Sequence, residues 1–100
     1  MSKERVFTRA AVLGTGAWGT TFAQILADAG LNVTMWGRKA TTVDFINSGE
    51  NATYLPGIEL SDQISASTSI EEVVTGAQLI VIAVPVAGVR STLEAARPCL

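Results

Sequence analysis

Three glycines near the N-terminus have the spacing of a turn that binds phosphate groups. An apolar segment, residues 9–13, precedes them, and an amphipathic segment, residues 18–29, follows. Gly14 would allow a tight turn, Gly16 would let the backbone approach a pyrophosphate, and Gly19 would let the helix lie close to the strand. The free N–H groups at the helix start would face the phosphates. A strand-to-helix turn without a ligand needs only one glycine, so the motif predicts a dinucleotide site. The residues expected to bind the cofactor here are Gly14, Thr15, Gly16, Ala17, Trp18 and Gly19.

Two cations stand where many NAD-binding proteins have a carboxylate. That carboxylate follows the second strand and accepts hydrogen bonds from the ribose 2′-hydroxyl. Here the second apolar segment, residues 31–36, is followed by Gly37, Arg38 and Lys39. A guanidinium and an ammonium suit the extra 2′-phosphate of NADP, which a carboxylate would repel. The cofactor is therefore NADP or NAD, with NADP favoured, and a solvated basic turn is the alternative.

No residues with the spacing of a catalytic or metal site are found in the sequence. Histidine is absent and Cys99 is the only cysteine, which excludes a Cys/His metal site and a disulfide framework. The acidic residues form no obvious acid/base pair and are expected to be solvated. They include Asp28, Asp44, Glu50, Glu59, Asp62, Glu71, Glu72 and Glu94. We therefore expect no catalytic residue in this chain.

Composition indicates one small globular domain. Of the 100 residues, 48% are hydrophobic and 16% are charged, which is enough apolar material for a core. The net charge is −2 and the basic residues are scattered, so no nucleic-acid surface is indicated. No apolar run approaches the roughly 18 residues of a membrane span, and the N-terminus does not have the pattern of a signal peptide. The single cysteine suits a reducing compartment, and we expect a cytoplasmic protein.

Strand and helix patterns alternate along the chain. Alternation of this kind predicts an α/β protein with a parallel, doubly wound sheet of the Rossmann type. The fourth strand should lie beside the first, so that Gly14 to Gly19 and Val84-Pro85 flank the crevice at the point where the strand order reverses. Pro85 as a mere strand terminator is the alternative. The expected strands are residues 9–13, 31–36, 64–67 and 79–84, and the expected helices are residues 18–29, 42–46, 69–76 and 86–96.

The patterns also make specific predictions about faces and helix caps. In the first helix, Phe22, Ile25, Leu26 and Ala29 share one face, which should pack on the sheet. Gly30 should end that helix.

Further along the chain, Thr42 should cap the second helix, with Val43, Phe45 and Ile46 facing inward. The sequence Ser69-Ile70-Glu71-Glu72 matches a capping box.

Three further expectations concern exposure. The continuously apolar segment 79–84 should be a strand buried on both faces. The Trp18 ring is expected in the core more than against the cofactor, because aromatic side chains mostly bury area. Residues 1–7 should form a loose arm.

Several motifs together resemble the N-terminal part of bacterial NAD(P)-dependent glycerol-3-phosphate dehydrogenase. The resemblance runs from residue 9 almost to the end of the chain, and the Y-L-P-G sequence makes it more specific than the glycines alone. The motifs are Gly14-Thr15-Gly16-Ala17-Trp18-Gly19-Thr20, Trp36-Gly37-Arg38, Asn51-Ala52-Thr53-Tyr54-Leu55-Pro56-Gly57 and Ala83-Val84-Pro85. The family usually has a polar residue where this chain has Val86, so a side-chain hydrogen bond is lost there.

The resemblance implies roles for several residues. It places Ala17 and Trp18 at the cofactor pyrophosphate and ribose, Arg38 and Lys39 at the adenosine 2′-phosphate, and Tyr54 near the cofactor. It also implies reversible hydride transfer between a nicotinamide and the carbon shared by dihydroxyacetone phosphate and sn-glycerol 3-phosphate, feeding phospholipid synthesis. Residues 1–100 would then be a partial dinucleotide-binding domain, the N-terminal portion of a larger two-domain enzyme. The catalytic lysines and the substrate-phosphate site would lie in a helical domain outside this chain, and a homodimer is considered for the full-length protein.

Two alternatives on the same fold remain open. One is a nucleotide-sensing module that controls a channel or repressor without chemistry. The other is a different NADP reductase, such as a pyrroline-carboxylate or hydroxy-acid enzyme. Sensing modules commonly carry the acidic residue after the second strand that this chain lacks, and the Y-L-P-G sequence counts against both by resemblance.

Overall fold

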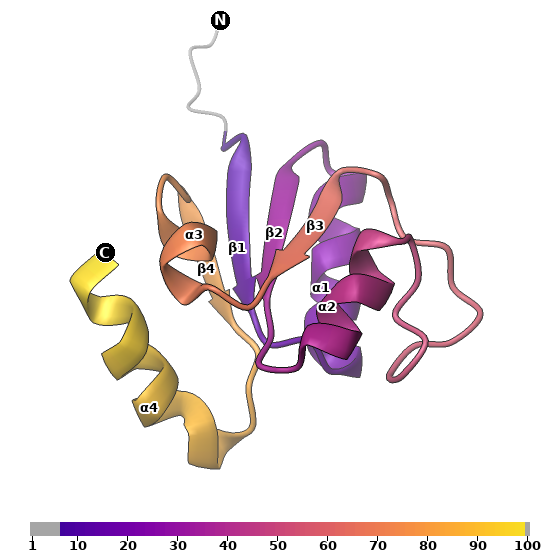
Figure 1. Ribbon diagram of the computed structural model, residues 1–100. Coiled ribbons are helices and arrows are strands. Elements are labelled where there is room, and N and C mark those ends of the chain that lie inside the picture. The colour runs from indigo at the N-terminus through magenta and orange to yellow at the C-terminus, as the bar shows by residue number, and fades with distance from the viewer. Residues whose placement is uncertain (1–6, 100) are drawn as a thin grey trace, which may run out of the picture.

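The computed structural model describes residues 7–99, in which strands and helices alternate along the chain (Figure 1). The strands are β1 (Arg9–Leu13), β2 (Asn32–Trp36), β3 (Ile64–Ser67) and β4 (Leu79–Ile82). The helices are α1 (Ala17–Asp28), α2 (Ala40–Asn47), α3 (Ile70–Val74) and α4 (Val86–Ala96), followed by a 3₁₀ turn, Arg97–Cys99. The predicted order of elements is confirmed. Most of the predicted N-terminal arm, residues 1–6, lies outside the described residues.

The four strands form one parallel sheet in the order β3-β2-β1-β4. In the centre of the sheet, Val12 of β1 pairs with Met35 of β2 on one side and with Val81 of β4 on the other. The chain therefore moves from β1 to β2 and β3 in one direction and then returns to the opposite side of β1. This confirms that the fourth strand lies beside the first and that the strand order reverses at β1.

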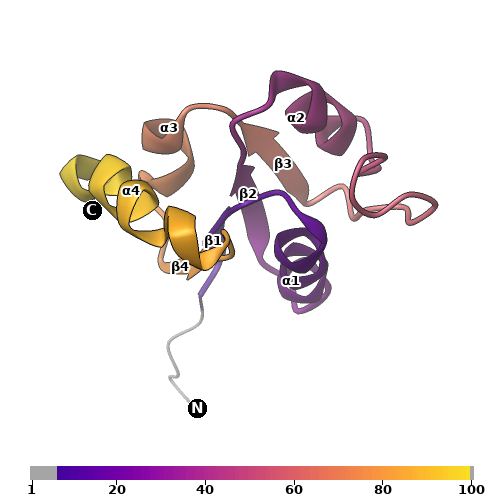
Figure 2. The same ribbon diagram turned by 90° about the horizontal axis from the view of Figure 1, so that it is seen from below.

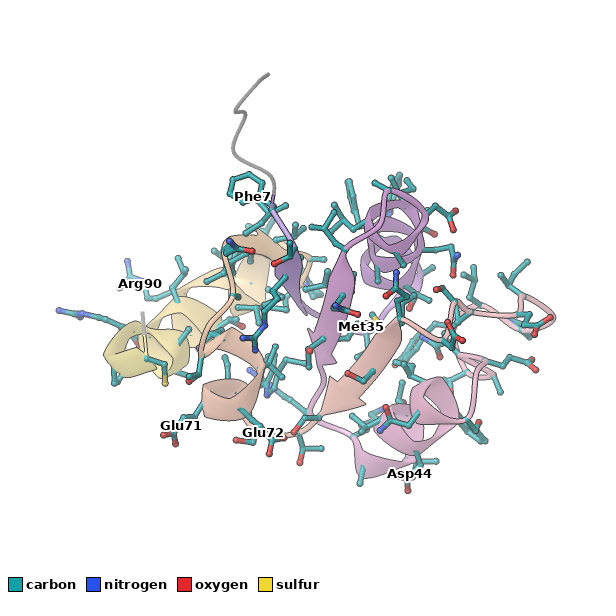
Figure 3. All side chains as sticks on the ribbon, turned by 90° about the horizontal axis from the view of Figure 1, so that it is seen from above. Phe7, Met35, Asp44, Glu71, Glu72 and Arg90 are labelled. Atoms are coloured by element: carbon teal, nitrogen blue, oxygen red, sulfur yellow. The ribbon has the colours of Figure 1, made fainter. Side chains whose placement is uncertain are left out.

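Helices cover both faces of the sheet, as Figure 2 shows from below. Side chains of successive strand residues point to opposite faces, so β1, β2 and β4 contribute to two cores. The core under α1 and α2 contains Ala10, Val12, Ala23, Ala27, Val33, Met35 and Ile46. The core under α3 and α4 contains Ala11, Leu13, Trp36, Val73, Val74 and Ala96. Met35 is labelled inside the molecule in Figure 3, between the sheet and its covering helices.

The predicted inner face of α1 is wrong. Phe22 and Ile25 are exposed, and the buried positions of the helix are Gly19, Thr20, Ala23 and Ala27. Of the four residues predicted to pack on the sheet, only Leu26 contacts the core, and it is partly buried. Small side chains let the helix axis approach the sheet closely, and this close packing turns the larger side chains away from it.

The end of α1 follows the prediction. Gly30 has a φ of +99°, a conformation that glycine adopts without steric cost. The Gly30 N–H donates to the Ala27 carbonyl (2.9 Å), and the Leu31 N–H donates to the Leu26 carbonyl (3.1 Å). These two bonds form a Schellman motif, which directs the chain out of α1 toward β2.

The start of α2 differs from the prediction. The helix begins at Ala40 with Lys39 as its N-cap residue, so Thr42 lies within the helix and does not cap it. Val43 and Ile46 are buried as predicted, but Phe45 is 38% exposed. The helix starts directly after the β2 turn, so that both Thr41 and Thr42 lie within its first turn.

The capping box of α3 is confirmed in part. The Ser69 hydroxyl accepts a hydrogen bond from the Glu72 N–H at 3.3 Å, as the pattern predicts for the first half of the box.

The last strand is shorter and more exposed than predicted. β4 ends at Ile82, and all of its residues are partly exposed, where a strand through residue 84 buried on both faces was expected. Among the described residues, β4 has a strand neighbour on the β1 side only. A parallel strand becomes fully buried only when the sheet continues past it and helices cover both faces.

Candidate functional site

A cavity of about 880 Å³ opens at the carboxyl ends of β1, β2 and β4. These ends point downward in Figure 1, where the starts of α1 and α4 also lie. Open parallel sheets bind ligands at such an edge, where the strand order reverses. The volume falls within the range of roughly 300–1,000 Å³ that is typical of small-molecule sites. The walls are formed by the turn after β1, the turn after β2, the first half of α4 and the side chain of Tyr54.

The glycine turn forms the floor of the cavity, and each glycine has a different neighbour. Gly14 has a φ of +131°, and a β-carbon there would lie 2.4 Å from the Ala83 carbonyl oxygen. A β-carbon at Gly19 would lie 2.4 Å from the Gly14 carbonyl oxygen, so α1 starts in close contact with the turn. At Gly16 a β-carbon would meet no protein atom within 4 Å. The first and third glycines are thus required by the fold itself, whereas the space beside Gly16 is open for a ligand.

The N-terminus of α1 is available to an anion. Gly16 is the N-cap residue, no side chain within the described part of the chain caps the helix, and its first turn contains no acidic residue. The Thr20 N–H closes the first helical bond to the Gly16 carbonyl at 3.0 Å, which leaves the earlier N–H groups of the helix unpaired. Unpaired N–H groups and the positive end of the helix dipole together favour a phosphate oxygen.

Basic side chains form the wall after β2. Arg38 and Lys39 are exposed and both line the cavity. The Arg38 guanidinium lies over the Trp36 ring, 5.7 Å from its centroid, and the Trp36 indole N–H donates to the Thr68 carbonyl at 3.1 Å. The ring is thereby fixed, and a cation over its face gains a favourable interaction that orients the guanidinium. Within the described part of the chain, the residues that line the cavity include no Asp or Glu.

A buried asparagine connects the glycine turn to the segment that carries Tyr54. The Asn51 side chain is fully buried, and its amide N–H groups donate to the Thr15 carbonyl (2.8 Å) and to the Thr20 hydroxyl (2.7 Å). Its side-chain oxygen accepts from the Tyr54 N–H at 3.2 Å. The predictions above assign no role to Asn51. Its place within the N-A-T-Y-L-P-G motif was the only signal in the sequence.

The rim of the cavity carries exposed aromatic rings. Trp18 is 76% exposed, so the expectation that its ring lies in the core is wrong. The side chain leaves the first turn of α1 on the cavity side, away from the sheet. Phe22 and Tyr54 also line the cavity and are 43% and 41% exposed. A flat ligand would cover apolar area on all three rings.

The segment after β4 closes the remaining side. Pro85 lines the cavity and is the N-cap residue of α4. Because β4 already ends at Ile82, the alternative that Pro85 is a mere strand terminator is wrong. Val86 points away from the protein, with 91% of its side chain exposed. Within α4, Thr92 is buried with no hydrogen-bond partner for its hydroxyl among the described residues.

The structure brings the predicted cofactor-binding residues together. All of them line the cavity except Gly19, which lies beneath the turn. Sequence reasoning did not assign several further lining residues, most of them apolar or small. These are Phe22, Trp36, Gly37, Thr42, Ile82, Ala83, Ala87, Gly88, Ser91 and Thr92, whereas Val84 lines the cavity as predicted.

Charged groups elsewhere form no second site in residues 7–99. Figure 3 shows Asp44, Glu71, Glu72 and Arg90 projecting outward from the helices. Residues 7–99 contain no cluster of three or more His, Cys, Asp or Glu that could hold a metal ion. In the same range no helix is long and apolar enough to cross a membrane.

Comparison with known proteins gives the same assignment from sequence and from structure. Residues 9–100 match the family model described as NAD-dependent glycerol-3-phosphate dehydrogenase N-terminus. The chain is 48% identical over 90 residues to glycerol-3-phosphate dehydrogenase [NAD(P)+] of Thermobifida fusca, covering 88% of this chain and 27% of that protein. It is 49% identical over 86 residues to the protein of the same name from Streptomyces griseus, covering 85% of this chain and 26% of that protein.

Among solved structures, glycerol-3-phosphate dehydrogenase from Coxiella burnetii is similar with a TM-score of 0.87 and 28% identity. The match covers 94% of this chain and 29% of that one. The sheet is therefore of the Rossmann type that was predicted. The chain spans about a quarter of the length of the relatives named above. Because the family model matches residues 9–100, the chain belongs to the family described as NAD-dependent glycerol-3-phosphate dehydrogenase N-terminus.

Proposed function

We propose that the cavity binds NADP or NAD and that this chain is the cofactor-binding part of a glycerol-3-phosphate dehydrogenase. One observation carries the proposal: the open space beside Gly16 adjoins the uncapped N-terminus of α1. A pyrophosphate needs both backbone N–H donors and room for its oxygens at the same place. Relatives that share up to 49% of aligned residues are named as NAD(P)+ enzymes, which supports the same cofactor for this chain.

The parts of the cofactor can be assigned to parts of the wall. The pyrophosphate is proposed at the turn residues Thr15, Gly16 and Ala17, with Trp18 beside the adjoining ribose. The adenosine 2′-phosphate of NADP is proposed at Arg38 and Lys39, because a phosphate gains charge-assisted hydrogen bonds from these side chains. None of the described residues that line the cavity carries a carboxylate, which supports a preference for NADP over NAD.

The proposed reaction is a reversible hydride transfer. Dihydroxyacetone phosphate, a proton and the reduced nicotinamide cofactor give sn-glycerol 3-phosphate and the oxidised cofactor. The nicotinamide supplies the hydride, and this chain's residues bind and orient the cofactor at the edge of the sheet. The catalytic residues and the site for the substrate phosphate are proposed to lie outside residues 1–100, in a helical domain of the full-length protein. The product would feed phospholipid synthesis.

A cytoplasmic location and a homodimeric full-length protein complete the proposal. Cys99 is a free thiol, which suits a reducing compartment. Among residues 7–99, one edge of β4 has no strand neighbour, and this edge with its apolar side chains supports contact with further protein at this side of the sheet.

The test is an assay of the full-length protein. Consumption of NADPH or NADH is measured after addition of dihydroxyacetone phosphate, with protein-free and substrate-free controls. The proposal predicts turnover that requires this substrate. Cofactor binding without turnover would indicate a sensing module instead. Turnover only with a pyrroline carboxylate or a keto acid would indicate a different reductase on the same fold.

A further inference from the structure

Asn51 lies behind the glycine turn, on the side away from the cavity. It is absent from the cavity lining and fully buried, and its side chain makes three hydrogen bonds of 2.7–3.2 Å. A buried amide that uses both N–H groups and its oxygen has one fixed orientation. Asn51 therefore connects three parts of the chain with defined geometry: the Thr15 carbonyl of the turn, the Thr20 hydroxyl at the start of α1 and the N–H of Tyr54.

These bonds hold the Thr15 and Gly16 carbonyl groups of the turn. The Thr15 carbonyl accepts directly from Asn51, and the Gly16 carbonyl accepts from the Thr20 hydroxyl at 2.8 Å. The Thr20 hydroxyl in turn accepts from Asn51. Carbonyl oxygens that pointed into the cavity would repel a phosphate. Because the hydrogen bonds keep these oxygens on the side of the turn away from the cavity, an anion can bind in the cavity.

The position of the Thr15 carbonyl also sets the direction of an N–H group. Thr15 and Gly16 share one planar trans peptide, in which the C=O and N–H bonds point in opposite directions. Because the carbonyl points toward Asn51, the Gly16 N–H points toward the cavity, and residues 7–99 provide no acceptor for it. A glycine allows the adjoining peptides to rotate more freely than any other residue does. The Asn51 and Thr20 bonds remove that freedom.

The same residue fixes the segment that carries Tyr54. The Asn51 side-chain oxygen accepts from the Tyr54 N–H, and the Asn51 carbonyl accepts from the Leu55 N–H at 2.8 Å. The Tyr54 side chain is thereby held at the cavity wall. A displacement of Asn51 would move the phosphate side and the Tyr54 side of the cavity together.

We propose that Asn51 is a positioning residue of the cofactor site, which acts through Thr20 and the Thr15–Gly16 peptide to keep the N–H groups of the turn directed at the pyrophosphate. This inference rests on the proposed function. It predicts that loss of the Asn51 amide weakens NADPH and NADH equally, because both contain the pyrophosphate. A residue that reads the 2′-phosphate would change the ratio of the two dissociation constants instead.

The experiment compares two variants with two matched controls in the full-length protein. Asn51→Ala removes all three side-chain bonds. Thr20→Val keeps the shape of the side chain but removes its hydroxyl, and with it the bond to the Gly16 carbonyl and the acceptor of one Asn51 N–H, while the Asn51 bonds to Thr15 and Tyr54 remain. Thr21→Val is the control for the second variant, since the Thr21 hydroxyl donates to the Ala17 carbonyl (2.8 Å) with the same helical spacing. Asn47→Ala is the control for the first, since Asn47 also makes two side-chain bonds to backbone, at Ala66.

Dissociation constants for NADPH and NADH are measured well below each variant's melting temperature, so that only folded protein is compared. We expect Asn51→Ala and Thr20→Val to raise both constants by about tenfold or more at an unchanged ratio. The controls should bind as the wild type does, even where they lower the melting temperature. If Asn51→Ala does not fold, Thr20→Val decides the outcome.

Three results would overturn the inference. One is that both variants bind within about a factor of two of the wild type. Another is that the controls weaken binding as much as the variants do, which would make the role merely structural. The third is a changed ratio of NADPH to NADH affinity. If the wild-type protein binds neither cofactor, the proposed function itself is wrong and this inference falls with it.

Discussion

Gly19 at the start of α1 packs directly against the carbonyl group of Gly14. A β-carbon at Gly19 would lie 2.4 Å from that oxygen and 3.4 Å from the Ala83 side chain. With any residue larger than glycine at position 19, the helix could not start this close to the strand ends. This contact sets the distance between the first N–H groups of α1 and the cavity.

Gly19→Ala is expected to destabilise the protein. Its methyl group must displace backbone, and overpacking of this kind costs about 1–3 kcal/mol. The melting temperature should fall in proportion. Gly88→Ala is the matched control, because a β-carbon there meets only Val84 side-chain atoms at an ordinary 3.8 Å. Equal melting temperatures for the two variants would contradict the close contact.

Arg38→Ala is expected to separate the two cofactors. Loss of a charge-assisted hydrogen bond to the 2′-phosphate should weaken NADPH by about tenfold to a hundredfold and leave NADH nearly unchanged. The contact is exposed, so the NADPH preference of the wild type should shrink as salt is added. Dissociation constants of both cofactors in the full-length protein, at two ionic strengths, provide the measurement. If both weaken equally, Arg38 orients the turn after β2 and does not read the 2′-phosphate.

Residues 1–100 produced alone are expected to self-associate. β4 is entirely apolar, partly exposed and, within the described residues, unpaired along one edge. An apolar strand edge of this kind is a template for further pairing. Sedimentation over a range of concentrations should show species larger than the monomer that grow with concentration. A monomer throughout the range would argue that side chains already protect the edge.

The strands, helices and glycine turn that position the site could be predicted from the sequence, because local residue patterns determine them. β1 and α4 were predicted with the bounds that the structure shows. The glycine turn was equally predictable, since the spacing of Gly14, Gly16 and Gly19 directly after an apolar segment is itself the signal for it. Secondary-structure and turn patterns of this kind depend on residues that are close together in the sequence, so they can be recognised from the sequence alone.

The features that the sequence did not predict depend on contacts between distant segments. The inner face of α1 is made of small residues such as Ala23, whereas apolar periodicity favoured Phe22 and Ile25. Trp18 is exposed because the turn directs its side chain to the cavity. The hydrogen bonds of Asn51 reach Thr20, which is 31 positions earlier in the chain, and Thr15, which is 36 positions earlier. No local sequence pattern signals these contacts.

The central claim is that the cavity beside Gly16 holds the cofactor. Gly16 has a φ of −72° and open space around a β-carbon, so Gly16→Val should fold with only a small change in melting temperature. The added side chain would occupy the volume that we assign to the pyrophosphate. The measurement is the titration of wild-type and Gly16→Val full-length protein with NADPH, with the melting temperature of each recorded. The account predicts at least about a tenfold loss of affinity at a nearly unchanged melting temperature, and affinity within about a factor of two of wild type would contradict it.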